Sequence, residues 1–101
     1  MTVEFHVTAE HIQAGTPARG CPVELAMCEA IPGLEVVVGT ALISVIGPSG
    51  AERCIPTPLS VAEFVRHFDA GLVFRAVPFS FGLDLPAEIM NEALVGGQGL
   101  P

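Results

Sequence analysis

Three cysteines and three histidines are the side chains of this chain best suited to nucleophilic or metal chemistry. Cys21 comes directly before Pro22, and proline is favoured at the first position of a helix. A thiol at that helix start would lie near unpaired N–H groups and the positive end of the dipole, which lower a thiol pKa. A cysteine nucleophile also needs a base, and His11 on the adjoining segment is the best placed candidate. The alternative, which we favour, is a cysteine that only caps and packs the helix.

The spacing of Cys21 and Cys28 argues against a disulfide and against a metal site. The two residues are seven positions apart, so on one helix their Cα atoms are separated by about 10 Å. A disulfide requires Cα atoms within about 7 Å. Structural zinc sites use closely spaced ligand pairs, and adding Cys54 does not create one. We therefore expect free thiols, no metal and no cofactor.

The charge of the chain limits the classes of partner. Its 101 residues include eleven Asp and Glu against four Arg and no Lys, for a net charge of −7. Phosphate backbones and anionic membranes are bound by clustered basic residues, so we expect neither nucleic acid nor membrane. A protein partner of unknown identity with a basic surface is favoured, because opposite charge speeds the encounter. The alternative is that the acidic surface only keeps the domain soluble.

The apolar segments indicate a cytoplasmic protein. The first residues alternate apolar and polar side chains, unlike the basic and then apolar pattern of a signal peptide. The longest apolar runs, 36–38 and 42–46, are much shorter than a membrane span. We expect a reducing compartment with unpaired cysteines.

The periodicity of apolar residues predicts strand, helix, three strands, helix and strand, in that order. The expected strands are 2–8, 34–38, 41–46, 53–55 and 77–84, the expected helices begin at Pro22 and at a serine cap at Ser60, and a short C-terminal helix is an option over 86–94. Residues 9–20 are expected to be a loop with at most one helical turn. The apolar residues at helical spacing that we expect on the buried face of the first helix, its apolar stripe, are Val23, Ala26, Met27 and Ala30.

Three local signals set the expected boundaries. Gly39-Thr40 predicts a hairpin with a type II′ turn, because glycine readily adopts the positive φ of the first central position. Ser60 and Glu63 have the spacing of a capping box at the start of the second helix. Gly71 predicts a left-handed terminator after the stripe Val61, Phe64, Val65, Phe68 and Leu72.

These elements predict an α+β fold in one small domain over 1–95, followed by a flexible tail over 96–101. The simplest arrangement that buries both helical stripes is one mostly antiparallel sheet of four to five strands with two helices packed on one face. The set of Phe64, Phe68, Phe74, Phe79 and Phe81 is expected in the core, because it lacks the basic neighbours of a base-stacking surface.

Three segments carry a resemblance to known sequences: 21–26 (CPVELA), 64–71 (FVRHFDAG) and 77–83 (VPFSFGL). In this order they resemble a group of short uncharacterised proteins from actinobacteria and their bacteriophages. Some members have a further cysteine before the Cys-Pro pair, where this chain has Ala18 and Arg19. The resemblance covers Phe5 to Leu83, rests on helix and strand motifs, and implies no activity.

We therefore expect a non-enzymatic accessory protein, encoded by a phage or prophage, that binds a host or phage protein. The expected contact residues are Glu10, His11, Arg19, Glu63, Arg66 and His67. One alternative is a cysteine-dependent enzyme or thiol sensor that uses Cys21 with His11. Another is a homo-oligomeric module that pairs through an open sheet edge.

Overall fold

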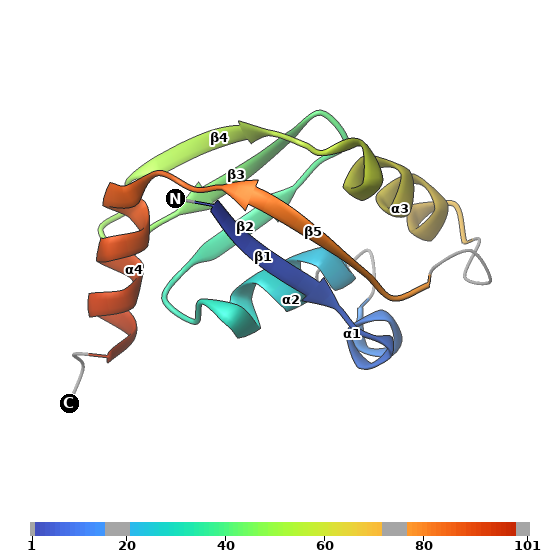
Figure 1. Cartoon of the computed structure of the whole chain (residues 1–101), viewed down its shortest axis with the longest axis horizontal. Coiled ribbons are helices and arrows are strands. Elements are labelled where there is room, and N and C mark those ends of the chain that lie inside the picture. Colours follow the sequence, from blue (N-terminus) through green and yellow to red (C-terminus); the bar gives the residue numbers. More distant parts are fainter. Residues whose placement is uncertain (1, 16–20, 72–76, 99–101) are drawn as a thin grey trace.

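The structure is a computed structural model, and it describes residues 2–15, 21–71 and 77–98. Its elements are β1 Thr2–Val7, α1 Ala9–Ala14, α2 Pro22–Ala30, β2 Glu35–Val38, β3 Leu42–Ile46, β4 Glu52–Pro56, α3 Leu59–Asp69, β5 Phe79–Asp84 and α4 Ala87–Gln98. The α3 and α4 helices lie at opposite ends of the long axis (Figure 1). The α+β class and the expected order are confirmed, with α1 as an additional short helix.

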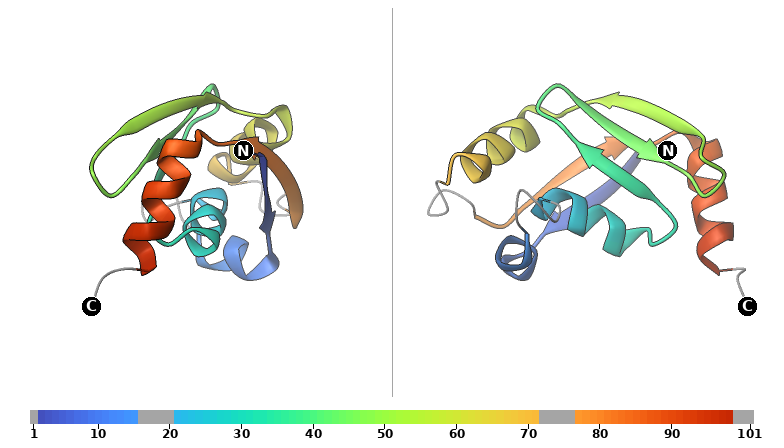
Figure 2. Two further views of the ribbon diagram at one scale, coloured as in Figure 1. Left: turned by 60° about the vertical axis from the view of Figure 1, so that its left-hand side comes forward. Right: turned by 180° about the vertical axis from the view of Figure 1, so that it is seen from behind.

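The expected single sheet is wrong, because the described strands form two separate antiparallel sheets. One has the order β1-β5 and the other has the order β2-β3-β4. The α2 helix packs against both β1 and β2 and lies between the sheets (Figure 2). The carboxylate of Glu24 on α2 accepts the backbone N–H of Val38, the last residue of β2, at 2.8 Å. Among the described strands, β2 pairs only with β3.

The core forms where the two sheets meet α2. Val23, Ala26 and Met27 of α2 are buried, as the helical stripe predicted, whereas Ala30 is exposed. From β1 and β5 the alternating residues Phe5, Val7, Phe81 and Leu83 are buried, and from the other sheet Val36, Ile43 and Val45. Burying each such side chain stabilises the fold by about 1.5–3 kcal/mol before the loss of chain entropy.

The α3 stripe is confirmed, but the start of the helix differs from the prediction. Val61, Phe64, Val65 and Phe68 are buried, while Leu72 lies outside the described residues. The helix begins at Leu59 with Pro58 at its N-cap and no capping side-chain bond, so the Ser60–Glu63 capping box is wrong. The Pro58 carbonyl already accepts the Ala62 N–H at 3.0 Å, so the first helical hydrogen bond forms before Ser60 and Ser60 lies inside the helix. Gly71 has φ +78, as expected for a left-handed terminator.

Two further boundaries differ from the sequence prediction. In the β2–β3 hairpin, the Gly39 N–H donates to the Leu42 carbonyl at 2.9 Å, so Thr40 and Ala41 form the connection. Gly39 does not have a positive φ, and the type II′ turn is therefore wrong. At the other end of the chain, α4 extends to Gln98 and so includes three residues of the expected tail, 96–98.

The α4 helix is held tightly against the loops of the three-stranded sheet. A methyl group at Gly33 would overlap the carbonyl oxygen of Ala93 on α4. The Ser49 N–H donates to Glu92 Oε1 at 2.6 Å. Arg53 of β4 and Glu88 of α4 form an ion pair at 3.3 Å. This end of the molecule therefore combines close packing with paired polar groups.

Candidate functional site

Cys21 lies at the N-cap of α2, as predicted, but its environment is unsuitable for a thiolate. The residue is 8% exposed and its side chain makes no capping hydrogen bond. Burial raises the pKa of its thiol to about 11 and outweighs the backbone N–H groups of Glu24 and Val23, which act in the opposite direction. The predicted lowering of this pKa is therefore wrong, because loss of hydration disfavours the charged form.

Cys28 is also in a poor environment for a nucleophile. It lies on the half-buried flank of α2, and its thiol donates to the Leu34 carbonyl at 3.5 Å. Burial raises its pKa from the usual value. Of the cysteines only Cys54 is exposed, on β4, where Sγ lies 3.5 Å from the Ser44 hydroxyl.

His11 is a buried structural residue, whereas a base on an open loop was expected. It is the third residue of α1, and its Nδ1 accepts the Thr8 N–H at 2.9 Å while the Thr8 side chain accepts the His11 N–H. Since Nδ1 is an acceptor, the proton of neutral His11 resides on Nε2 and is donated to Glu29 at 2.9 Å. Both ring nitrogens therefore join α1 to its cap and to α2, and neither is available to Cys21.

The described residues also offer no site for a metal ion. Nowhere among them do three His, Cys, Asp or Glu side chains come together in a geometry that could hold one. Among the same residues, no helix has the length and apolar character needed to cross a membrane.

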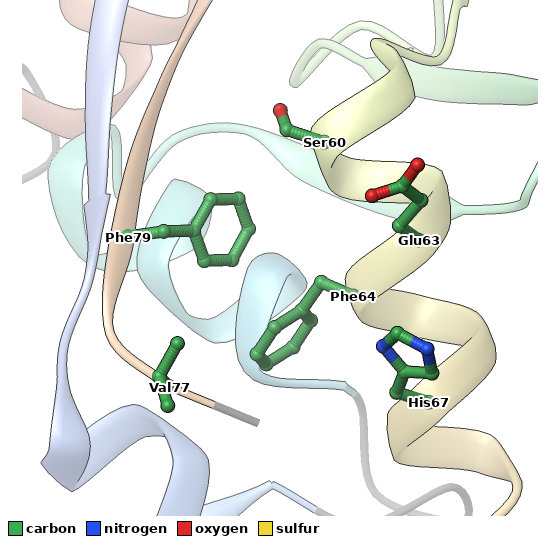
Figure 3. Close-up of a pocket in the computed structure, with 6 residues that line it drawn as sticks. All are labelled: Ser60, Glu63, Phe64, His67, Val77 and Phe79. Atoms are coloured by element: carbon green, nitrogen blue, oxygen red, sulfur yellow. The ribbon is translucent and has the colours of Figure 1, made fainter. Parts of the chain in front are cut away.

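A groove between α3 and the start of β5 is the best candidate for a binding site, and we call it the α3–β5 groove. It is an open hollow of about 280 Å³ (Figure 3). Its lining residues are Ser60, Glu63, Phe64 and His67 from α3, with Val77 and Phe79 from the β5 side. The α3 residues share one face because positions three or four apart on a helix are neighbours.

The floor of the groove is aromatic and continuous with the core. The rings of Phe64 and Phe79 are 4.9 Å apart, and Phe79 lies 5.8 Å from Phe81. Phe81 in turn contacts Phe5 on β1 at 5.5 Å. These rings connect α3 to the β1–β5 sheet, so the floor is fixed by packing. At its border Val77 is 59% exposed, which leaves apolar surface in contact with solvent.

The wall of the groove is polar and has no partner within the described part of the chain. Glu63 is exposed and His67 is half-buried, and neither side chain makes an ion pair or a hydrogen bond with another described residue. Ser60 and His67 are seven residues apart on one helix, so their Cα atoms are about 10 Å apart. A nucleophile and its base must be joined by a hydrogen bond of about 3 Å, and none joins the side chains of these two described residues, so they do not form a catalytic pair.

The structure brings together some of the predicted contact residues and separates others. Glu63 and His67 line the α3–β5 groove, but Arg66 is exposed elsewhere on α3. Glu10 is exposed on α1, His11 is buried, and Arg19 lies outside the described residues.

Sequence reasoning missed the apolar half of this groove. Phe64 is buried and Phe79 half-buried, in keeping with the expected core role, yet both also line the groove. The available signal was the row of Ser60, Glu63 and His67 directly beside the apolar stripe of α3. Phe74 lies outside the described residues.

Comparison with known proteins gave no relatives: no family model, no curated protein and no solved structure matches this chain.

Proposed function

We propose that this protein is a non-enzymatic binding module whose α3–β5 groove holds a segment of a partner protein. The observation that carries the proposal is a fixed aromatic floor, Phe64 and Phe79, directly beside Glu63, a carboxylate without a partner among the described residues. This combination favours a segment with an apolar side chain next to a basic one. The proposal includes that the protein is encoded by a phage or prophage and binds a host or phage protein.

The open shape of the groove favours a peptide segment over a small-molecule substrate. Pockets that enclose drug-sized ligands and cofactors have volumes of about 300–1,000 Å³ and bury most of the ligand. At about 280 Å³ and open to solvent, this groove is large enough for one or two side chains. An apolar side chain buried there contributes about 1.5–3 kcal/mol, so neighbouring contacts must supply the remaining affinity.

Charge supports a basic partner. The chain has a net charge of −7, and its four basic residues are all arginines. A positively charged segment is attracted to such a surface at long range, and a lysine or arginine beside Glu63 would form a short-range ion pair. The enzymatic alternative has less support, because burial holds the Cys21 pKa at about 11.

Selection of peptides from a random displayed library against the wild-type protein tests the proposal. We expect the enriched peptides to combine an aliphatic or aromatic residue with lysine or arginine. Val77→Asp introduces a charge at the border of the floor, and Glu63→Lys reverses the charge of the wall. Each is expected to weaken binding by about tenfold or more, measured by fluorescence anisotropy.

Matched control variants are available on the three-stranded sheet. Val37 is 56% exposed, close to the 59% of Val77, and Glu35 is an exposed glutamate on the same strand as Val37. Val37→Asp and Glu35→Lys should leave peptide binding unchanged. The proposal fails if no peptide is enriched, or if the enriched peptides bind all four variants equally.

A further inference from the structure

The α3–β5 groove brings an aromatic ring and a carboxylate to one space from two different elements. Phe79 lines it from β5 and Glu63 lines it from α3 (Figure 3). The Phe79 ring is half-buried and lies 4.9 Å from the ring of Phe64, so packing fixes its position. Glu63 is exposed, and its carboxylate has no partner among the described residues. A ligand in the groove can therefore contact both groups without breaking a bond within the described part of the chain.

The polar wall of the groove consists of groups that accept hydrogen bonds. An ionised carboxylate only accepts, a serine hydroxyl accepts as well as donates, and a neutral imidazole has one accepting nitrogen. Ser60 and His67 lie about one helical turn before and after Glu63 on the same face of α3. Among the described residues that line the groove, none is a lysine or an arginine. The wall is therefore suited to a cationic group with several N–H donors.

Arginine is the cationic side chain that matches both the ring and the wall. Its guanidinium is planar and weakly hydrated, stacks on aromatic faces, and donates two parallel N–H bonds to a carboxylate. Its remaining N–H groups can be donated to neighbouring acceptors such as the Ser60 hydroxyl. Lysine instead has a compact and strongly hydrated charge, which loses more hydration beside an apolar floor.

We propose that the α3–β5 groove selects an arginine of the partner segment, whose guanidinium lies over Phe79 and pairs with the Glu63 carboxylate. This inference rests on the function proposed above and specifies which basic side chain the groove holds. The net charge of −7 attracts lysine and arginine alike at long range. Only the short-range contacts with the ring and the carboxylate distinguish the two.

The test compares three blocked five-residue peptides on the wild-type protein, so it needs no variant that might fold poorly. Each has a central residue flanked on both sides by valine and then alanine, and that residue is arginine, lysine or citrulline. Citrulline keeps the planar shape of arginine but has no charge. We expect the arginine peptide to bind at least about fivefold more tightly than the lysine peptide and about tenfold more tightly than the citrulline peptide, by NMR titration.

Two variants identify the groups responsible for the preference. Phe79→Leu keeps an apolar floor but removes the ring, so the preference for arginine over lysine should fall below about twofold. Glu63→Gln removes the charge from an exposed side chain and should weaken the arginine peptide by about tenfold. The matched control is Glu35→Gln, at an exposed glutamate on β2, and it should leave binding unchanged.

Arginine selection is overturned if the lysine or citrulline peptide binds as tightly as the arginine peptide, or if the arginine peptide does not bind. It is also overturned if Phe79→Leu keeps the full preference or if Glu63→Gln binds like wild type. These outcomes are separate from failure of the proposed function. That function stands if Val77→Asp still weakens binding of peptides selected from the library, and it fails if no peptide is enriched.

Discussion

At one end of the long axis α4 is joined to the loops of the three-stranded sheet, whereas at the other end α3 leaves a groove against β5 (Figure 1). At the α4 end, Glu92 accepts an N–H and Glu88 pairs with Arg53. At the α3 end, Glu63 and His67 have no partner among the described residues. The difference suggests where binding takes place, because polar groups already bonded within the fold would have to give up those bonds to bind a partner.

The strongest test of this comparison is a pair of glycine substitutions. At Gly33 an added methyl would overlap the backbone of Ala93, so Gly33→Ala should force α4 away and lower the free energy of unfolding by about 2–4 kcal/mol. At Gly82 in β5 the nearest atom, on Thr2, would be 3.8 Å away, and Gly82→Ala should change stability by less than about 0.5 kcal/mol. Urea denaturation measures both. Equal losses would mean that α4 is not tightly packed.

Cysteine reactivity compares a buried thiol with an exposed one. With the pKa of Cys21 raised to about 11 by burial, only about 0.1% of this thiol is ionised at about pH 8. A protein whose only cysteine is Cys21, made by Cys28→Ser and Cys54→Ser, should react with a disulfide reagent more than about a hundredfold slower than one that retains only the exposed Cys54. Comparable rates would contradict the burial of Cys21 and restore the thiol-sensor hypothesis.

Two histidines test the same distinction on a smaller scale. His11→Ala removes the bonds to Thr8 and Glu29, and should lower the free energy of unfolding by about 1–2 kcal/mol. His67→Ala removes a side chain with no bonding partner among the described residues, so its effect on stability should stay within about 0.5 kcal/mol. Thermal or urea unfolding at neutral pH separates the two. A larger loss for His67→Ala would place this residue in the fold rather than in the groove.

The smallest expected effect is a pH dependence at the α4 end. The Ser49 N–H lowers the pKa of Glu92 from its usual 4.5. Because the folded-state pKa is below the unfolded one, ionised Glu92 stabilises the fold above the unfolded value, and this contribution disappears as the pH falls through the folded-state value. Wild type should be slightly more stable than Glu92→Gln at about pH 6, and the difference should be smaller at about pH 3, by urea denaturation. A constant difference at both values would contradict this.

Local signals in the sequence predicted several helix ends and helix faces, because these features depend on residues that are close together along the chain. Pro22 predicted the start of α2, and the four-residue spacing of Val61 and Val65 predicted part of the buried face of α3. Gly71 predicted the left-handed residue that follows α3. Local signals also failed where two of them competed. Ser60 had the spacing of a capping box, yet the N-cap is Pro58, two residues earlier, and the helix begins at Leu59. A capping box does form between Thr8 and His11. The sequence analysis did not recognise it because the third helical residue is histidine rather than the usual glutamate or glutamine.

The sequence by itself determined the class of fold, the order of the elements and the acidic charge, since periodicity and composition are properties of the chain alone. Only the tertiary structure decided that there are two sheets, that His11 is buried, and that Cys21 resists ionisation. It also decided that Phe79 and Glu63, sixteen residues apart, line one groove. Strand pairing and loss of hydration depend on which distant residues come into contact, and a local pattern carries no information about that contact.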